Sequence, residues 1–339
     1  MSKIDYNRFL NMIKHKPADA PVFFEHYIEW GVIFDVLGDD KVDQDNPKWG
    51  YVNNMMHAHA KLGCDVCQCN MPGLTGFLYP KADQIKGESI SQNHEGIIYD
   101  EESFANYKWP DPEKADVKFY LDELKKCAPD GLKVVLGPGR GIFESLVDLV
   151  GFDNLCMMVF DNPELIKKIV NEVGSRAYRF MEKGINHDFV IGYYTSDDWG
   201  YKTALMFSPD FMREYIFPWH KKIVELAHSA GKIAILHSCG NIDLVMDDII
   251  DDIKYDALTS FEDVIEPVES VYERYGDRIA ILGGLDQDYM HTASPEEITA
   301  RAKNLFEMSK DKGGYAIGTG NSITDSMAKE NWKAIYCWK

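Results

Sequence analysis

Short apolar runs rich in Val, Ile and aromatic residues alternate along the chain with longer amphipathic stretches. Eight of these runs have the length and composition of buried β-strands. They cover residues 21–27, 64–70, 133–139, 189–195, 232–239, 256–262, 279–286 and 314–321. Amphipathic segments of helical length lie between several of them, at residues 163–183, 208–230 and 295–312, and Asn-Pro or Ser-Pro pairs open these segments.

Strands that alternate with helices indicate βαβ units and a parallel sheet. Eight such strands favour a closed (β/α)₈ barrel, the TIM barrel, over an open doubly wound sheet, which usually has fewer strands. We therefore predict a single α/β barrel domain over residues 1–339. The stretch 71–131 is rich in Pro, Gly and polar residues, and it is predicted to form an extended loop region after the second strand.

The composition excludes several classes of partner. Hydrophobic residues make up 45% of the chain, which is enough to bury a large core. The excess of 55 Asp and Glu over 36 Lys and Arg gives a net charge of −19, which disfavours binding to nucleic acid or to an anionic membrane. No apolar run approaches the length of about 18 residues that a membrane helix needs. We expect a cytoplasmic protein with reduced thiols.

Polar side chains gather at the carboxyl ends of the predicted strands. They are Glu25, His26, Cys69, Asn70, Arg140, Asp197, Asp198, His237, Cys239, Glu262, Asp286 and Asn321. In a barrel these ends meet on one face, which is where enzymes of this architecture carry out their chemistry.

His237 and Cys239 are two residues apart on one strand, so both side chains face the same side and are able to bind one ion. Glu262 ends the next strand and should lie beside them. A set of N, S and O ligands points to zinc. The alternative is a buried histidine bonded to the backbone next to a core cysteine.

Other residues at this face are candidates for substrate contacts and catalysis. Asp197 and Asp198 face opposite sides, and we expect Asp198 to face the pocket as a proton donor; the alternative is a pair that caps the next helix. Tyr193 and Trp199 would line an aromatic pocket, unless they only pack. Arg140 would bind an anion, unless it belongs to a plain turn.

His26 completes the expected substrate contacts, whereas Cys64, Cys67 and Cys69 are interpreted as structural thiols of an apolar strand.

Four segments carry a resemblance to a known family. HSCGN at 237–241, SFED at 260–263, ERYGDRIAILGGLD at 273–286 and GGYAIGTGNSI at 313–323 resemble the carboxyl half of the uroporphyrinogen decarboxylase superfamily. The resemblance extends from about Tyr193 to the end of the chain and implies a (β/α)₈ barrel. The superfamily includes the decarboxylase, zinc-dependent methyltransferases that act on corrinoid proteins, and the catalytic barrel of cobalamin-independent methionine synthase.

In the methyltransferases the resemblance implies a zinc site of His-x-Cys with a later Cys, and with a Glu in the methionine synthase branch. His237, Cys239 and Glu262 match this pattern, whereas Asn321 stands in place of the later Cys. Asn321 could coordinate through its amide oxygen, bond to the substrate, or leave a ligand position to water, and we place it among the catalytic residues.

The arginine-rich segment by which the decarboxylase grips a tetrapyrrole has no counterpart, because no arginine lies between Arg8 and Arg140. The sequence therefore favours a zinc methyltransferase that moves a methyl group from a small methylated substrate, a methyl ether above all, to a corrinoid protein. Two alternatives remain. One is a decarboxylase-like lyase that uses Arg140 and Asp198, and the other is a non-catalytic barrel that binds a corrinoid or another ligand.

Overall fold

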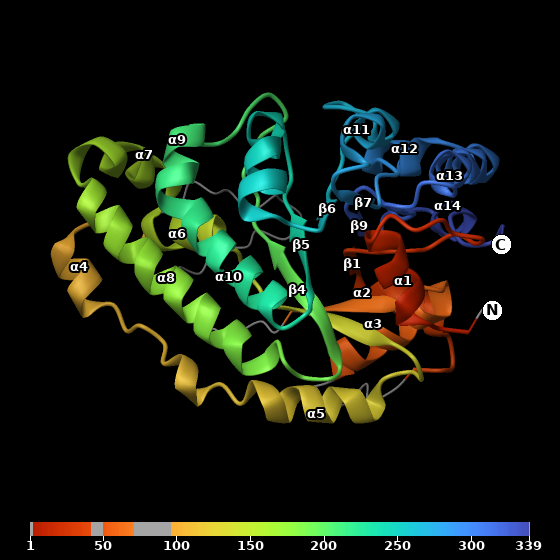
Figure 1. The fold of residues 1–339 in the computed structure, drawn as a ribbon, viewed down its shortest axis with the longest axis horizontal. Helices are drawn as coiled ribbons and strands as arrows, with labels where there is room; N and C mark the ends of the chain where they lie inside the picture. The colour runs from red at the N-terminus through yellow and green to blue at the C-terminus, as the bar shows by residue number, and fades with distance from the viewer. Residues whose placement is uncertain (1–2, 42–49, 71–95, 339) are drawn as a thin grey trace.

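A computed structural model describes residues 3–41, 50–70 and 96–338. Its main feature is a curled, all-parallel sheet of seven strands in the order β2-β3-β4-β5-β6-β7-β8, enclosed by helices (Figure 1). The strands are β2 (Val66–Asn70), β3 (Lys133–Gly137), β4 (Val190–Ser196), β5 (Ile233–His237), β6 (Ala257–Thr259), β7 (Ala280–Leu282) and β8 (Tyr315–Ala316). Each lies within one of the predicted runs, except that β4 extends one residue beyond its run to Ser196. The prediction of a TIM-barrel-like α/β fold is confirmed.

The first predicted strand is less regular than the others. Phe23 forms a parallel bridge with Ile317, and the amide of Phe24 donates to the Ile317 carbonyl at 3.0 Å. Further along, the two-residue strand β1 (Tyr27–Ile28) pairs with β9 (Ser322–Ile323). The amino-terminal segment therefore lies beside the carboxyl-terminal strands, as expected for a sheet that curls toward closure.

Two apolar layers explain why the strands are almost continuously hydrophobic. One layer fills the inside of the sheet. It consists of residues of α1, of the segment before β1 and of the strands β2 to β8: Phe9, Met12, Ile13, Val22, Phe24, Val66, Val135, Ile191, Tyr194, Ile233, Ile235, Ala257, Ala280, Leu282 and Ala316. The other layer lies between the strands and the surrounding helices. A strand that is buried on both faces has no solvated side, which gives a run rather than an alternation.

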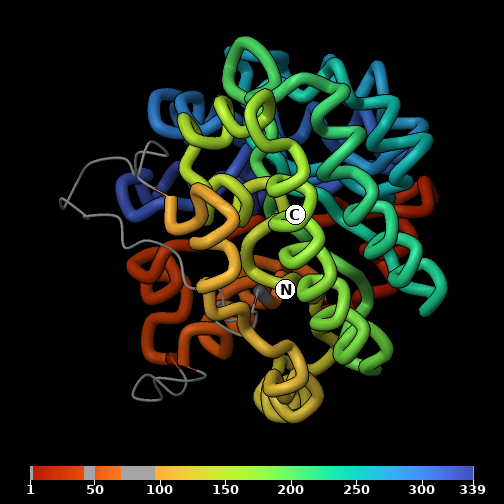
Figure 2. The backbone as a smooth tube through the Cα atoms, turned by 90° about the vertical axis from the view of Figure 1, so that its left-hand side faces the viewer, coloured from red at the N-terminus to blue at the C-terminus, as the bar shows by residue number. Residues whose placement is uncertain are grey.

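Helices follow most strands and cover the outside. They are α1 (Tyr6–Ile13), α2 (Trp30–Leu37), α3 (Gly50–Leu62), α4 (Glu101–Asn106), α5 (Val117–Cys127), α6 (Ile142–Val150), α7 (Phe152–Asp161), α8 (Pro163–Gly184), α9 (Pro209–Phe211), α10 (Phe217–Ser229), α11 (Val268–Tyr275), α12 (Gln287–Thr292), α13 (Pro295–Ser309) and α14 (Lys329–Ala334). Figure 2 shows α8 and α10 next to each other on the outer surface, where they are in contact. In the described part of the chain, no helix combines the length and apolar character that crossing a membrane requires.

Two predicted segments differ from expectation in detail. The predicted helix 208–230 passes through a π-helical turn at Met212–Ile216, just before Pro218, which has no amide hydrogen to continue an α-helical ladder. The predicted loop 71–131 is helical in places, because α4 and α5 lie within residues 96–131. Residues 71–95 lie outside the described residues. Since α5 leads into the start of β3, it lies at the amino-terminal ends of the strands, away from the expected site (Figure 1).

The thiols of Cys64, Cys67 and Cys69 are fully buried in the layer between strands and helices. Replacing Cys67 by Ala removes one buried sulfur atom and should lower the free energy of unfolding by about 1–3 kcal/mol. The metal content of the purified protein should not change. Urea unfolding and elemental analysis of the Cys67→Ala variant check both values, and a stoichiometric loss of metal would contradict a structural role.

Candidate metal centre

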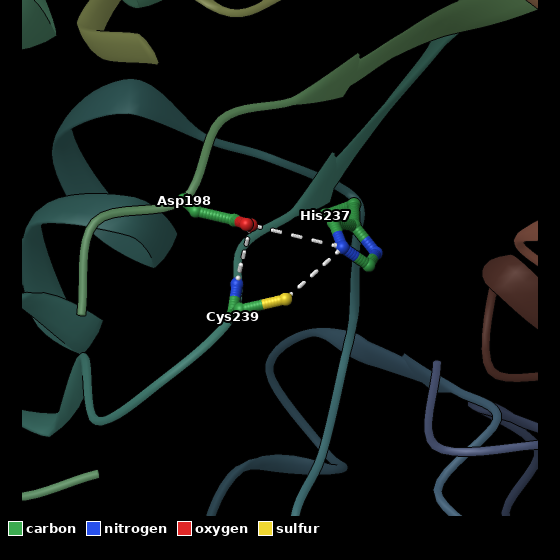
Figure 3. Close-up of side chains that lie close together, drawn as sticks. All are labelled: Asp198, His237 and Cys239. Carbon is green, nitrogen blue, oxygen red and sulfur yellow. Dashed lines mark hydrogen bonds and ion pairs between the residues drawn. The ribbon is translucent and has the colours of Figure 1, made fainter. Parts of the chain in front are cut away.

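Two neighbouring strands bring three possible metal ligands together. β4 and β5 are paired with Ser196 opposite His237, and the amide of Asp197 continues the ladder by donating to the His237 carbonyl at 2.9 Å. Because the two strand ends are level, Asp198 and Cys239, which follow them, point toward the His237 imidazole (Figure 3).

The distances in this group are short. His237 Nε2 lies 3.4 Å from Cys239 Sγ and 3.8 Å from Asp198 Oδ1. One ligand atom from each of the three residues lies within 4.8 Å of the other two, and among the described residues this is the group of His, Cys, Asp and Glu side chains that meets this condition. These separations fit the edges of a small coordination polyhedron with bond lengths of about 2.0–2.3 Å.

A glycine turn after the strand holds Cys239 in place. Gly240 has φ +82°, and a Cβ atom there would lie 2.1 Å from the Gly200 carbonyl oxygen. A side chain at position 240 would therefore push the two loops apart. The Cys239 amide donates to Asp198 Oδ1 at 2.9 Å, which fixes the carboxylate next to the thiol.

The ionisation of the group suits a borderline metal. Burial lowers the pKa of His237 to about 3, so its imidazole is neutral at physiological pH. Burial, together with the negative charge of Asp198, raises the pKa of the Cys239 thiol well above its ordinary value. The buried Nδ1 atom of His237 has no hydrogen-bond partner among the described residues. A neutral imidazole, a thiol and a carboxylate form a donor set that fits zinc.

Two further side chains contact the sulfur atom of Cys239. Ser260 Oγ donates to Cys239 Sγ at 3.3 Å, and Asn321 Nδ2 does so at 3.3 Å. The predicted site residue Asn321 therefore lies at the centre, where its amide nitrogen rather than its oxygen faces the sulfur. Ser260 was not predicted as a site residue, because a serine next to a strand end is common.

Glu262, the carboxylate expected to bind the metal, lies outside this group. Its Oε2 atom is 4.0 Å from Lys202 Nζ, and it lines a separate small pocket of about 60 Å³ beside Ser260 and Asn241. Asp198, expected to be a proton donor, is the carboxylate that lies together with His237 and Cys239.

His26 forms one wall of the site. Its ring stacks on His237 with centroids 3.8 Å apart and an angle of 17° between the planes. Its Nδ1 atom is hydrogen-bonded to the Tyr194 hydroxyl. Burial, and then the neighbouring His237, lower the pKa of His26 well below its ordinary value. His237 Nδ1 makes no hydrogen bond among the described residues, so the stack adds to the contacts of Nε2 with Cys239 and Asp198 in orienting the ring.

The other predicted pocket residues lie further out. Tyr193 and Trp199 are 1% and 0% exposed and pack in the layer between strands and helices, where Tyr193 faces Tyr255. The aromatic residue that faces the site is Tyr194, the next residue along β4. A strand places consecutive side chains on opposite faces, so only one of the two tyrosines reaches the interior.

Arg140 is held by two carboxylates of α6. Its Nε atom donates to Asp148 Oδ2 at 2.9 Å, and its Nη1 atom donates to Glu144 Oε1 at 3.0 Å. Burial raises the pKa of Glu144 above its ordinary value, against the attraction of Arg140. The negative charge of Glu144 in turn helps to raise the pKa of Cys239, so this carboxyl is within electrostatic reach of the centre.

A buried polar network supports Asp198 from behind. Asp197 points away from the site and accepts hydrogen bonds from His220 Nε2 at 2.8 Å and from the Glu144 amide at 2.9 Å. His220 Nδ1 is bonded to the Tyr255 hydroxyl at 2.7 Å. Burial alone would raise the pKa of Asp197, but the hydrogen bond and charge of His220 outweigh it and lower the pKa. No spacing in the sequence connects His220 with this network.

A second buried carboxyl lies at the end of the first strand. Glu25 Oε1 accepts from the Thr319 amide at 3.0 Å, and Oε2 accepts from the Thr319 hydroxyl at 2.6 Å. The Tyr336 hydroxyl is a third donor. Burial raises the pKa of Glu25 to about 7, although these three hydrogen bonds oppose the shift.

Comparison with known proteins identifies the protein family of this chain. The chain belongs to the uroporphyrinogen decarboxylase family, whose model matches residues 85–336. The resemblance predicted from the sequence is thereby confirmed. None of the curated proteins compared with the chain matches it.

Among solved structures, the fold is similar to that of a methyltransferase from Methanosarcina mazei. The TM-score is 0.67 at 17% sequence identity, over 97% of this chain and 96% of that protein. At this identity the similarity shows the fold alone. An intracellular xylanase from Thermoanaerobacterium saccharolyticum also aligns, with a TM-score of 0.41 and 12% identity over 94% of this chain and 99% of that one.

Zinc binding should release about one proton per metal ion at pH 6. The proton comes from Cys239, because its pKa is raised, whereas His237 has a pKa of about 3 and is already neutral. At this pH a zinc-bound water, which ionises near pH 7, adds little. Calorimetric titration of the metal-free protein in two buffers of different ionisation enthalpy measures the number. Release of two protons or none would contradict this ligand set.

Glu25 should make the protein less stable as pH rises. A pKa near 7 in the folded state, against 4.5 ordinarily, means that the folded protein holds an extra proton between these values. The free energy of unfolding should therefore fall by about 3 kcal/mol from pH 4.5 to pH 7 and then level off. In Glu25→Gln this contribution is absent. Urea unfolding of both proteins at pH 5 and pH 8 tests this, and parallel pH dependences would refute it.

Proposed function

We propose that this protein is a zinc-dependent methyltransferase that transfers a methyl group from a small methylated substrate to the cobalt of a separate corrinoid protein. The observation that carries the proposal is the meeting of His237, Cys239 and Asp198 at the carboxyl ends of β4 and β5. Membership of the family and a fold shared with a methyltransferase support it. A methyl ether is the favoured donor.

Each residue of the centre has a defined part in this proposal. Bound zinc would supply a Lewis acid for the oxygen atom of the methyl donor. His237 and Cys239 would hold it, with Asp198 as the oxygen ligand in place of Glu262. The stacked ring of His26 helps to keep His237 in orientation, and the hydrogen bond between His220 and Asp197 holds the residue next to Asp198 in place.

In the proposed transfer, the electron pair of cobalt(I) on the partner would form the new bond to the methyl carbon while the bond from carbon to oxygen breaks. The oxygen keeps the electron pair of the broken bond and takes a proton from water, which gives an alcohol or a phenol. The mouth of the barrel must therefore accept both a small substrate and a protein-bound corrinoid.

A decarboxylase-like lyase is the second candidate, because the family includes decarboxylation. It would need a cation for the carboxylate of its substrate. Arg140 is the cation predicted for this part, but its guanidinium already binds Asp148 and Glu144. A substrate carboxylate would have to displace an existing ion pair, which makes this reaction less favourable here.

The zinc-loaded protein should convert a corrinoid protein reduced to cobalt(I) into the methyl-cobalt(III) form when it is given a suitable donor. The absorbance change of the corrinoid measures the rate, with a panel of methyl ethers, methylamines and methyl thioethers. Cys239→Ala and Asp198→Asn should each lower both zinc content and rate by at least about tenfold. Cys67→Ala, which removes a buried cysteine that is not part of the group of ligands, is the control and should retain both.

Two results would change the proposal. If Asp198→Asn kept its zinc and lost only rate, Asp198 would be the proton donor expected from the sequence, and another carboxylate would bind the metal. If no donor methylated the corrinoid but the protein released carbon dioxide from a porphyrinogen, the lyase would replace the methyltransferase.

A further inference from the structure

The sulfur atom of Cys239 receives two hydrogen bonds from outside its own strand. Ser260 follows β6, and Asn321 lies between β8 and β9. Both donor atoms, Ser260 Oγ and Asn321 Nδ2, are 3.3 Å from Sγ. Donors therefore approach the sulfur from two other parts of the sheet.

The backbone at Ser260 is strained in a way that serves this contact. Its φ angle is +91°, in the left-handed region that non-glycine residues rarely adopt. The amide of Ser238 donates to the carbonyl of Thr259, and the amide of Phe261 donates to that of Gly320, so the residues on both sides of Ser260 are fixed. Strain that the surrounding structure holds in place is found most often at functional sites.

Asn321 reaches the sulfur through a close approach of two turns. A Cβ atom at Gly320 would lie 2.4 Å from the carbonyl oxygen of Phe261, so only glycine allows this distance. The amide of Asn321 is oriented by its neighbours, because its Oδ1 atom accepts from Ser322 Oγ at 3.0 Å. The opposite orientation would place an oxygen lone pair against the sulfur, which is itself an acceptor.

We propose that Ser260 and Asn321 are positioning residues that act on the metal through Cys239, by withdrawing electron density from its thiolate. The inference rests on the proposed function and specifies the substrate class of the same site. A thiolate that donates less charge leaves a bound zinc more electrophilic. Such an ion suits a substrate that leaves through oxygen, such as a methyl ether or methyl ester, better than a thiol that must be activated as a nucleophile.

This assignment gives Asn321 a specific reason to stand at the position where the family resemblance implies a second cysteine. A cysteine would add a second thiolate and its charge to the metal. An asparagine adds no charge and reduces the donation from the thiolate that is present. The two effects act in the same direction, toward a harder and more acidic metal ion.

Cobalt(II) is the probe for this proposal, because its bond to a thiolate gives a charge-transfer band in the near ultraviolet that needs no methyl transfer to be seen. The metal-free protein is loaded with cobalt(II), and the spectrum is compared with those of Ser260→Ala, Ser260→Gly and Asn321→Ala. Without a donor, the sulfur electrons lie higher in energy, so the band should move to longer wavelength. The shift should be larger when Ser260→Ala and Asn321→Ala are combined.

Two variants separate the hydrogen bond from other effects. Ser260→Gly relieves the strained φ angle while it also removes the hydroxyl, and it should shift the band as far as Ser260→Ala does. Ser238→Ala removes the hydroxyl next to Cys239, which accepts from the Trp199 amide at 3.1 Å and is not one of the donors to the sulfur described above. Its band should stay at the wild-type position.

The outcomes are distinct. An unchanged band in both Ser260→Ala and Asn321→Ala, with cobalt still bound, would overturn this inference alone. Loss of cobalt from Asn321→Ala would overturn it too, since Asn321 would then be a ligand. A wild-type protein that binds no cobalt would refute the metal centre and this inference together. Shifted bands in a protein that methylates no corrinoid would leave the inference standing and refute the proposed function.

Discussion

The site depends on the register of β4 and β5. Because Ser196 pairs with His237, and the next amide of β4 donates to the His237 carbonyl, the two chains leave the sheet at the same level. A shift of one residue would turn every side chain on one strand to the other face. Asp198 would then lie where Asp197 does, among the helices, and the three ligand atoms would not meet. The hydrogen bonds of Asp197 with His220 and with the Glu144 amide favour this register, because Asp197 is fully buried and they satisfy its carboxylate in the present arrangement.

Most of the fold could be predicted from the sequence, for a simple physical reason. A parallel strand covered on both faces must be apolar almost throughout, so each strand from β2 to β8 stands out as a run. The first strand was harder to place, since its contacts are shared between a bridge at Phe23 and a short pairing at Tyr27–Ile28. The helices α4 and α5 were not predicted, because the Pro, Gly and polar residues of the stretch around them indicated a loop. The apolar face of α5, formed by Val117, Leu121 and Leu124, was present in the sequence but was not used.

The candidate site was predictable only in part. The two-residue spacing of His237 and Cys239 predicts that both side chains face one side, and the structure brings them together although β5 ends at His237. Glu262 was expected beside them because it ends the next predicted strand, but the positive φ angle of Ser260 ends the extended backbone two residues earlier. Asp198 lies beyond the end of its strand as well, and only the hydrogen bond from the Cys239 amide turns it toward the centre. Loop conformation of this kind is set by contacts between distant segments, which spacing cannot reveal.

The stacking of His26 on His237 determines which part of the chain a complete site requires. The family model matches residues 85–336, a range that contains Asp198, His237 and Cys239 but not His26. An excised fragment with those bounds would carry every proposed ligand and would still expose one face of the His237 ring to water. The Nδ1 atom of His237 has no hydrogen-bond partner among the described residues. Transfer of the site to another scaffold would therefore need the segment that carries His26 as well as the ligand residues.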